Sequence, residues 1–282
     1  MILVTGSTGN VGSEVVKQLA AGGHKVRALV VDTAEGSKFP TTVDTVAGNL
    51  DNIDSLVNAM KGVDHVYLLA PLTPALQKHE ANAIEAAKRA KVKHVVKHSV
   101  LGANYEAVAL GKWHRAGEKA LEASGVGWTH LRPSAFHANS LWWAQTIKTQ
   151  GAVYQPTGDG KIASIDPRDI AGCAVEVLTK PGHEGKSYEL TGPAALSASD
   201  QCDIIGRVLG KPVKFVNVPD QAARDSMLAM GMPAQIVDLM IEFMGLVRSG
   251  QAAAVTDTVQ KLTGKPSRSF EAWVKDNTAA FK

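Results

Sequence analysis

Short apolar runs alternate with helical periods over the first 132 residues of the chain. The runs are rich in Val, Leu and Ile and mostly lack a two-residue alternation, which is typical of parallel strands covered on both faces. They lie at 2–5, 25–31, 43–47, 65–69, 94–99 and 128–131. Asp51 or Asn52 is expected to cap a helix that begins near Ile53. The order predicts βαβ units and an α/β fold with a doubly wound parallel sheet.

The rhythm changes after Arg132, where Pro and Gly residues interrupt a stretch with several aromatic side chains. Beyond it the expected elements are a helix at about 168–179, a strand at 187–190, a helix ending at Gly210, a strand at 213–218, a Met-rich helical stretch at 220–247 and a last helix carrying Phe270, Trp273, Val274 and Phe281 on one side. We therefore expect a larger domain over 1–185, with 133–160 contributing to a substrate pocket, and a smaller C-terminal α/β subdomain over 186–282.

Composition and charge exclude several classes of protein. The 282 residues are 45% apolar and 20% charged, and 30 basic residues oppose 27 acidic ones. This charge balance does not favour a nucleic-acid partner, and the chain has no run of basic residues interleaved with aromatic ones. The longest apolar runs fall far short of the ~20 residues that a membrane-spanning helix needs. Cys173 and Cys202 are interpreted as buried thiols. Because residues 1–5 already read as a strand, we expect no leader and a cytoplasmic protein.

The most specific local signal is GSTGNVG at residues 6–12, which lies between an expected strand and an expected helix. In such a turn the first Gly permits the bend, the second lets backbone N–H groups approach a pyrophosphate, and the third lets the helix pack closely on its strand. The N-terminus of the following helix favours the anion. Although the spacing is GxxGxxG rather than GxGxxG, this context indicates an NAD(P)-binding site in a Rossmann sheet, with an ordinary glycine-rich strand-to-helix turn as the alternative.

The end of the second expected strand bears on the choice between NAD and NADP. An acidic group there accepts hydrogen bonds from a free ribose diol, and Asp32 is the candidate. A carboxylate would repel a 2′-phosphate, yet Asp32 could stand one or two residues too late to reach the ribose, and Lys38 could meet a phosphate. An ordinary solvated loop Asp is the structural alternative, so the coenzyme stays open.

Several motifs make nearly the whole chain resemble the NmrA-like branch of the atypical short-chain dehydrogenase/reductase superfamily. The longest runs from His114 to Asn139 and follows the pattern H-x3-E-x2-L-x2-SG-x3-T-x-LRP-x2-F-x2-N. The others include KVRALVVD, GNLDN, KHVVKHSVLGA and SIDPRDIA. That branch includes NAD(P)H:quinone oxidoreductases and a triphenylmethane dye reductase, and also regulators that bind dinucleotides.

The resemblance implies positions for the cofactor. The pyrophosphate would be cradled by Gly6, Ser7, Thr8, Gly9, Asn10 and Val11. The path from adenosine to nicotinamide would be lined by Leu69, Ala70 and Pro71, and Asn49 would face the adenine. Members that use NADPH usually carry an Arg where this chain has Val31, so the familiar contact to the 2′-phosphate is missing.

The superfamily's Tyr-x3-Lys pair would align with Leu110 and His114, so the phenol that protonates a carbonyl oxygen is absent. As the Lys equivalent, His114 could touch the nicotinamide ribose or relay a proton. Glu118, four residues on, could orient its imidazole or raise its pKa. Ser99, at the carboxyl end of the fifth strand, could bind the nicotinamide or the substrate. An ordinary helix hydrogen bond for His114 and a strand-ending role for Ser99 are the alternatives.

Aromatic side chains gather after the sixth expected strand, at Phe136, His137, Trp142 and Trp143, although aromatic residues make up only 5% of the chain. They could form a flat apolar wall for a planar acceptor. The alternatives are core packing of the subdomain and a lid against a second copy in a homodimer.

We therefore expect an NAD(P)H-dependent oxidoreductase that passes hydride to a quinone-like or other conjugated electrophile, an acceptor that needs no Tyr donor because its reduced product is delocalised. No metal is expected, because the H-x3-E spacing at His114 lacks a third ligand. The alternative is an NmrA-like redox sensor that binds a dinucleotide without turnover. An epimerase or dehydratase is disfavoured, because those enzymes also use the Tyr.

Overall fold

The computed structural model describes all 282 residues and divides them into two compact units. Unit 1 comprises Met1–Ala107, Gly111–Pro133 and Pro167–Glu189, and unit 2 comprises Val108–Leu110, Ser134–Asp166 and Leu190–Lys282. These units do not coincide with the expected division after residue 185. The segment after Pro133 folds with the C-terminal part of the chain, and the strand near residue 187 folds with the N-terminal sheet.

Unit 1 is built on a seven-stranded sheet with the order β3-β2-β1-β4-β5-β6-β9. Its strands are β1 (Ile2–Val4), β2 (Val26–Val30), β3 (Asp44–Ala47), β4 (His65–Leu68), β5 (His94–His98), β6 (Gly127–Pro133) and β9 (Lys186–Leu190). The first six strands of this order, from β3 at the edge through β2, β1, β4 and β5 to β6, each pair with their neighbours in parallel. The expected doubly wound Rossmann sheet is confirmed, and the carboxyl ends of β1, β4 and β5 lie at one edge of it.

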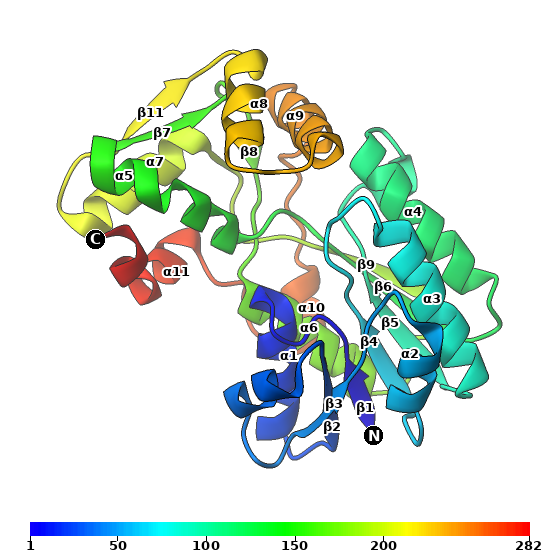
Figure 1. Cartoon of the computed structure of the whole chain (residues 1–282). Helices are drawn as coiled ribbons and strands as arrows, with labels where there is room; N and C mark the ends of the chain where they lie inside the picture. The colour runs from blue at the N-terminus through cyan, green and yellow to red at the C-terminus, as the bar shows by residue number, and fades with distance from the viewer. The chain divides into compact units, whose positions relative to one another are not determined.

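Helices cover both faces of this sheet. They are α1 (Asn10–Ala21), α2 (Ile53–Ala59), α3 (Leu76–Arg89), α4 (Ala109–Glu122) and α6 (Pro167–Thr179), with short 3-10 helices η1 (Thr33–Lys38) and η2 (Ala103–Tyr105). In Figure 1, α1 and α6 lie together on one face, and α2, α3 and α4 lie on the other. Asn52, rather than Asp51, caps α2, because its side chain accepts a hydrogen bond from the Ser55 amide. Buried Leu3, Leu56 and Val95 belong to the core beneath α2 and α3.

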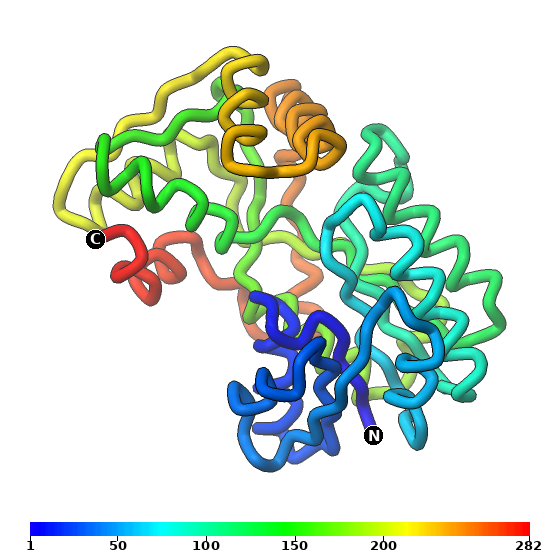
Figure 2. The backbone as a smooth tube through the Cα atoms, in the orientation of Figure 1, coloured from blue at the N-terminus to red at the C-terminus, as the bar shows by residue number.

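Unit 2 is a smaller α/β unit. Its elements are η3 (His137–Trp143), α5 (Ala144–Gln150), β7 (Ala152–Gln155), β8 (Lys161–Ile162), β10 (Leu196–Ser197), α7 (Ala198–Leu209), β11 (Lys214–Asn217), α8 (Asp220–Ala229), α9 (Ala234–Arg248), α10 (Thr258–Thr263), α11 (Phe270–Asp276) and η4 (Thr278–Phe281). Strands β7 and β11 form a parallel pair, visible in Figure 2 where the green and yellow segments run side by side. Strand β8 pairs with β10 in the antiparallel sense.

The Met-rich stretch of unit 2 is two helices rather than one. Gly231 adopts a φ of +83° just after α8, and Pro233 precedes the first residue of α9. A left-handed glycine ends a helix and a proline disfavours helical geometry in the residue before it, so the break falls between them. No helix anywhere in the chain combines the length and the apolar character needed to cross a membrane.

Candidate active site

The glycine turn of unit 1 has room for backbone only. Gly6 adopts a φ of +59°, and a Cβ at that position would overlap the side chain of Leu69 and stand 2.9 Å from its carbonyl oxygen. A Cβ on Gly12 would overlap the carbonyl group of Gly6. The turn is also tied to its neighbours, because Ser7 Oγ donates to the Leu29 carbonyl at 2.6 Å and Thr5 Oγ1 donates to the Leu69 carbonyl at 2.9 Å. These contacts fix the turn at the carboxyl edge of the sheet.

The N-terminus of α1 lies open beside this turn. Gly9 is its N-cap residue and supplies no side-chain hydrogen bond, and Thr8 and Asn10 are exposed. Free N–H groups and the positive end of the helix dipole at a glycine turn suit a pyrophosphate. The residues present therefore fit a dinucleotide.

The other residues implied for the cofactor also lie in unit 1. Leu69, Ala70 and Pro71 follow β4 next to the turn, and the Leu69 amide donates to Thr5 Oγ1 at 2.8 Å. Asn49 is exposed and accepts a hydrogen bond from the Asp51 amide at 2.9 Å, which leaves its side-chain amide nitrogen free to bind a ligand.

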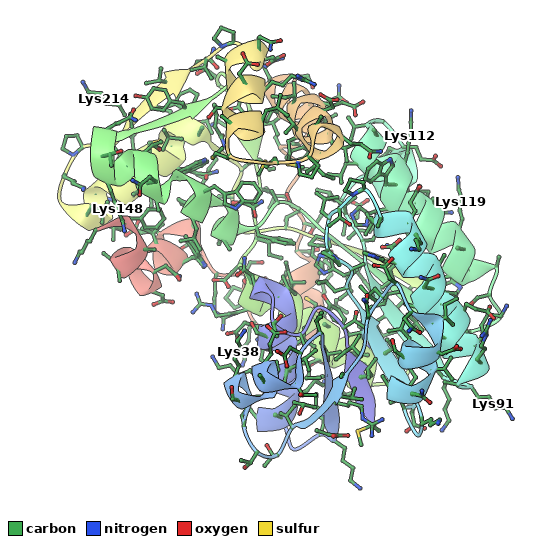
Figure 3. The ribbon with its side chains drawn as sticks, viewed as in Figure 1. Lys38, Lys91, Lys112, Lys119, Lys148 and Lys214 are labelled. Carbon is green, nitrogen blue, oxygen red and sulfur yellow. The ribbon has the colours of Figure 1, made fainter.

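The end of β2 is acidic. Val31 is 79% exposed, and Asp32 caps η1 by accepting from the Ala34 amide at 2.9 Å. Lys38, labelled in Figure 3, lies at the other end of η1, where its ammonium pairs with Glu35 at 3.0 Å. A 2′-phosphate at this edge would therefore meet a carboxylate and a lysine that is already paired.

His114 does not contact Glu118, so the expected pairing is wrong. Its Nδ1 lies instead 3.4 Å from Lys97 Nζ and 3.9 Å from Glu80 Oε1. Burial, with the charge of Lys97 and the neighbouring His98, lowers the pKa of His114 well below its usual value. The expected upward shift is therefore also wrong, because the closest charge is a cation rather than the Glu118 carboxylate.

Glu118 has a different partner. Arg132 of β6 binds its carboxylate in the bidentate manner, with Nε and Nη2 at 2.9 and 2.8 Å from the two oxygens. Arg115 donates to the same carboxylate at 3.0 Å. Burial opposes ionisation of Glu118, but hydrogen bonds, first of all those from Arg132, together with the nearby charges of Arg132 and His130 outweigh it and hold its pKa at about 2. Glu118 thus joins α4 to β6 as a charged group and leaves His114 to other neighbours.

Ser99 directly follows β5, two residues after Lys97, and is buried. Its amide donates to the Leu131 carbonyl at 2.7 Å, which continues the pairing of β5 with β6. The position at the carboxyl edge agrees with the expected one, and its contact with a ligand stays a prediction.

Three of the four aromatic candidates of unit 2 face its interior. His137 is buried, with Nδ1 2.9 Å from Ser164 Oγ and its ring edge-on to Phe270. Phe136 and Trp143 pack against the same core. Trp142 alone is open to solvent, with 61% of its surface exposed. Phe136, His137 and Trp143 thus contribute to the core of unit 2, and a substrate contact stays a prediction for all four residues.

Sequence reasoning missed Lys97 and Glu80. A lysine within the apolar strand HVVKHSV is a signal that could have been used, because a strand covered on both faces rarely buries an ammonium without a partner. The partner itself could not have been found, because Glu80 lies in α3 among several charged residues and only the packing of α3 on β5 selects it.

Comparisons with known proteins agree with this geometry. The NAD(P)H-binding family profile matches residues 6–181. The chain is 41% identical to an NAD(P)H azoreductase of Xenophilus azovorans, over 100% of this chain and 99% of that protein. The chain belongs to the NmrA-like atypical short-chain dehydrogenase/reductase family.

Two further relatives of this NmrA-like protein are full-length matches. A (4-alkanoyl-5-oxo-2,5-dihydrofuran-3-yl)methyl phosphate reductase of Streptomyces griseus subsp. griseus is 37% identical, over 100% of this chain and 99% of that one. The crystal structure of Escherichia coli NADPH-dependent quinone oxidoreductase QOR2 with NADPH has a TM-score of 0.90 and 27% identity, covering 99% of this chain and 100% of that one. The expected class, an NAD(P)H-dependent oxidoreductase, is confirmed.

Proposed function

We propose that this protein passes hydride from NAD(P)H to the conjugated π-system of a small electrophile, such as a quinone or an azo compound. The observation that carries the proposal is the backbone cradle at Gly6 and Gly12 beside the open N-terminus of α1. Three full-length relatives support the acceptor class, because an azoreductase, an oxo-dihydrofuran reductase and a quinone oxidoreductase are all named for conjugated acceptors. When bound, the reduced dinucleotide supplies the hydride.

The residues around α4 suit such an acceptor. Leu110, a buried apolar side chain, stands where the resemblance places the Tyr of ordinary members. Reduction of a simple ketone would lack a proton donor at this position. A quinone or azo acceptor delocalises the negative charge delivered with the hydride over its π-system, so a hydrogen bond is enough to stabilise it. His114 is the residue proposed to give that hydrogen bond, with Ser99 on the neighbouring strand end as a further polar group.

Coenzyme choice follows from the acidic end of β2. Asp32 can accept hydrogen bonds from a ribose diol, and Val31 offers a 2′-phosphate no positive charge. We expect NADH to serve at least as well as NADPH.

The test is oxidation of NADH and of NADPH, followed at the nicotinamide absorbance band, with small quinones, an azo dye and simple aldehydes as acceptors. Turnover of the quinones and the dye but not of the aldehydes is expected. Rapid aldehyde reduction would contradict the proposal. Tight dinucleotide binding without turnover of any acceptor would favour the sensor alternative, for which the regulator NmrA, at 18% identity, offers only a similar fold.

A further inference from the structure

An ion pair lies sealed between β5 and α3 of unit 1. Lys97 Nζ is 2.7 Å from Glu80 Oε1, and both side chains are almost completely buried. The other lysines are not buried, and Lys112 and Lys119 of α4 extend outward in Figure 3. A buried pair costs more in desolvation than it returns unless its geometry is excellent, so burial of this pair is weak evidence of a role in stability. Its surroundings indicate another role.

Each proton of the Lys97 ammonium has an acceptor. The acceptors are Glu80 Oε1 at 2.7 Å, the His98 carbonyl oxygen at 3.3 Å and His114 Nδ1 at 3.4 Å. An ammonium has no lone pair, so at His114 the ring nitrogen must accept. A proton on Nδ1 would face that cation, and the nearest carboxylate oxygen, at 3.9 Å, is too far to receive it. The contact therefore selects the neutral imidazole with its proton on Nε2.

The opposite end of the His114 ring is available. The His114 side chain keeps 12% of its surface exposed, and its Nε2 hydrogen-bonds to no protein group. Gly117 explains how α4 approaches so closely, because a Cβ at that position would overlap Glu80 Oε2. One turn earlier on the same helix, His114 contacts Lys97 through Nδ1, and its Nε2–H has no hydrogen-bond partner in the protein.

We propose that the Lys97–Glu80 ion pair is the positioning element of His114: it fixes the imidazole as the Nε2–H tautomer, so that a neutral N–H donor meets the anion formed when the acceptor is reduced. This inference rests on the proposed function for the acceptor, and the tautomer itself does not depend on it. A neutral, preorganised imidazole donor stabilises developing negative charge without becoming an imidazolium.

The proton transfers through the cluster balance when one proton is taken up from water. The Nε2 proton of His114 moves to the reduced acceptor's anionic oxygen or nitrogen, while a Lys97 proton moves to Nδ1. His114 stays neutral overall, because water then supplies one proton to Nε2 at the exposed end of the ring while the Nδ1 proton returns to Lys97, which restores both the Nε2–H form and the ammonium. Burial raises the pKa of Glu80, although the hydrogen bond and the charge of Lys97 act in the opposite direction, and its Oε2 has no hydrogen-bond partner.

The decisive measurement is the tautomer of His114, read from two-bond 15N–1H correlation spectra of histidine-labelled protein. The chain has nine histidines, and His114→Gln identifies the resonance. A pyridine-like Nδ1 with a pyrrole-like Nε2 is expected. The Lys97→Met/Glu80→Gln double variant removes both charges at similar volume, so that no unpaired buried charge prevents folding. In it the His114 signals should move toward mixed tautomers.

The same variants are then compared in the reductase assay. For the double variant, kcat should fall at least about tenfold with the dinucleotide Kd unchanged. Lys93→Met is the matched control, because Lys93 pairs with Asp64 at 2.8 Å just before β5 but is exposed, and it should change neither the tautomer nor kcat. An Nδ1–H tautomer in the wild type, or an unchanged tautomer in the double variant, overturns the inference. If the tautomer is as expected but no acceptor is reduced, the proposed function fails while the positioning of His114 stands.

Discussion

The glycine turn of unit 1 and the aromatic segment of unit 2 carry comparably conspicuous sequence signals, yet the structure uses them differently. At the turn, Gly6 and Gly12 remove side chains so that backbone can meet a ligand. In the aromatic segment, Phe136 and His137 add side chains that pack into the core of unit 2. The absence of a side chain is informative because close backbone approach demands it, whereas an aromatic side chain serves a core as well as a pocket.

Replacing a buried and an exposed tryptophan of unit 2 with Ala should give the largest difference in stability. Trp273 is buried in the core, so Trp273→Ala should cost about 3–5 kcal/mol of unfolding free energy. Trp142 is exposed, so Trp142→Ala should cost less than about 1 kcal/mol. Urea unfolding measures both. Equal losses would contradict the division of the aromatic residues into core and surface, and a raised KM for the acceptor in Trp142→Ala alone would support its predicted substrate contact.

A charged contact of unit 1 should show in the pH dependence of stability. The pKa of Glu118 is about 2 in the folded protein against an ordinary 4.5. A lowered pKa stabilises the folded state above the unfolded pKa, and this contribution is lost as the pH falls through 4.5 toward 2. The loss is about 3 kcal/mol. Glu118→Gln should lack this slope in urea titrations at several pH values.

The control for that titration is Glu106→Gln, which removes an exposed carboxylate paired with Lys119 at 2.6 Å. It should keep the wild-type slope, because an exposed pair contributes little. A slope that survives in Glu118→Gln would mean that other carboxylates cause it.

The backbone cradle can be broken by one methyl group. Gly12→Ala places a Cβ against the Gly6 carbonyl, so the turn must shift, and dinucleotide Kd should rise about 100-fold. Gly245→Ala is the matched control: it also lies in a helix, and its Cβ meets nothing closer than the Arg248 side chain at 3.9 Å. Cofactor fluorescence measures both affinities. Wild-type affinity in Gly12→Ala would show that the turn does not hold the dinucleotide.

The smallest expected effect concerns the coenzyme. Val31→Arg adds a cation at the exposed end of β2, where a 2′-phosphate would lie. The ratio of kcat/KM for NADPH to that for NADH should rise about tenfold, because one charge-assisted contact to the phosphate is worth about that much. Val255→Arg, an exposed valine of unit 2, should leave the ratio unchanged. No change in Val31→Arg would mean that the ribose is recognised elsewhere.

Much of the fold followed from local pattern. The strands up to residue 132 appear within about two residues of their expected bounds, because each is a short run rich in apolar residues between turn residues. The domain boundary could not be placed this way. A strand such as β9 is attached to its sheet by hydrogen bonds to distant residues, for example Gly185 N to the Trp128 carbonyl at 2.8 Å. Such pairing leaves no mark in the local sequence.

The sequence by itself determined the parallel sheet and the dinucleotide turn, because both depend on residues close together in the chain: apolar runs, and glycines three positions apart. Tertiary structure alone decided the environment of His114. Glu118, four residues after His114, pairs with Arg132 instead. The groups that do lie beside His114 are Lys97 of β5 and Glu80 of α3. A charge inside a fold pairs with whichever opposite charge packing brings within reach, so its partner is a property of the packed molecule rather than of spacing along the chain.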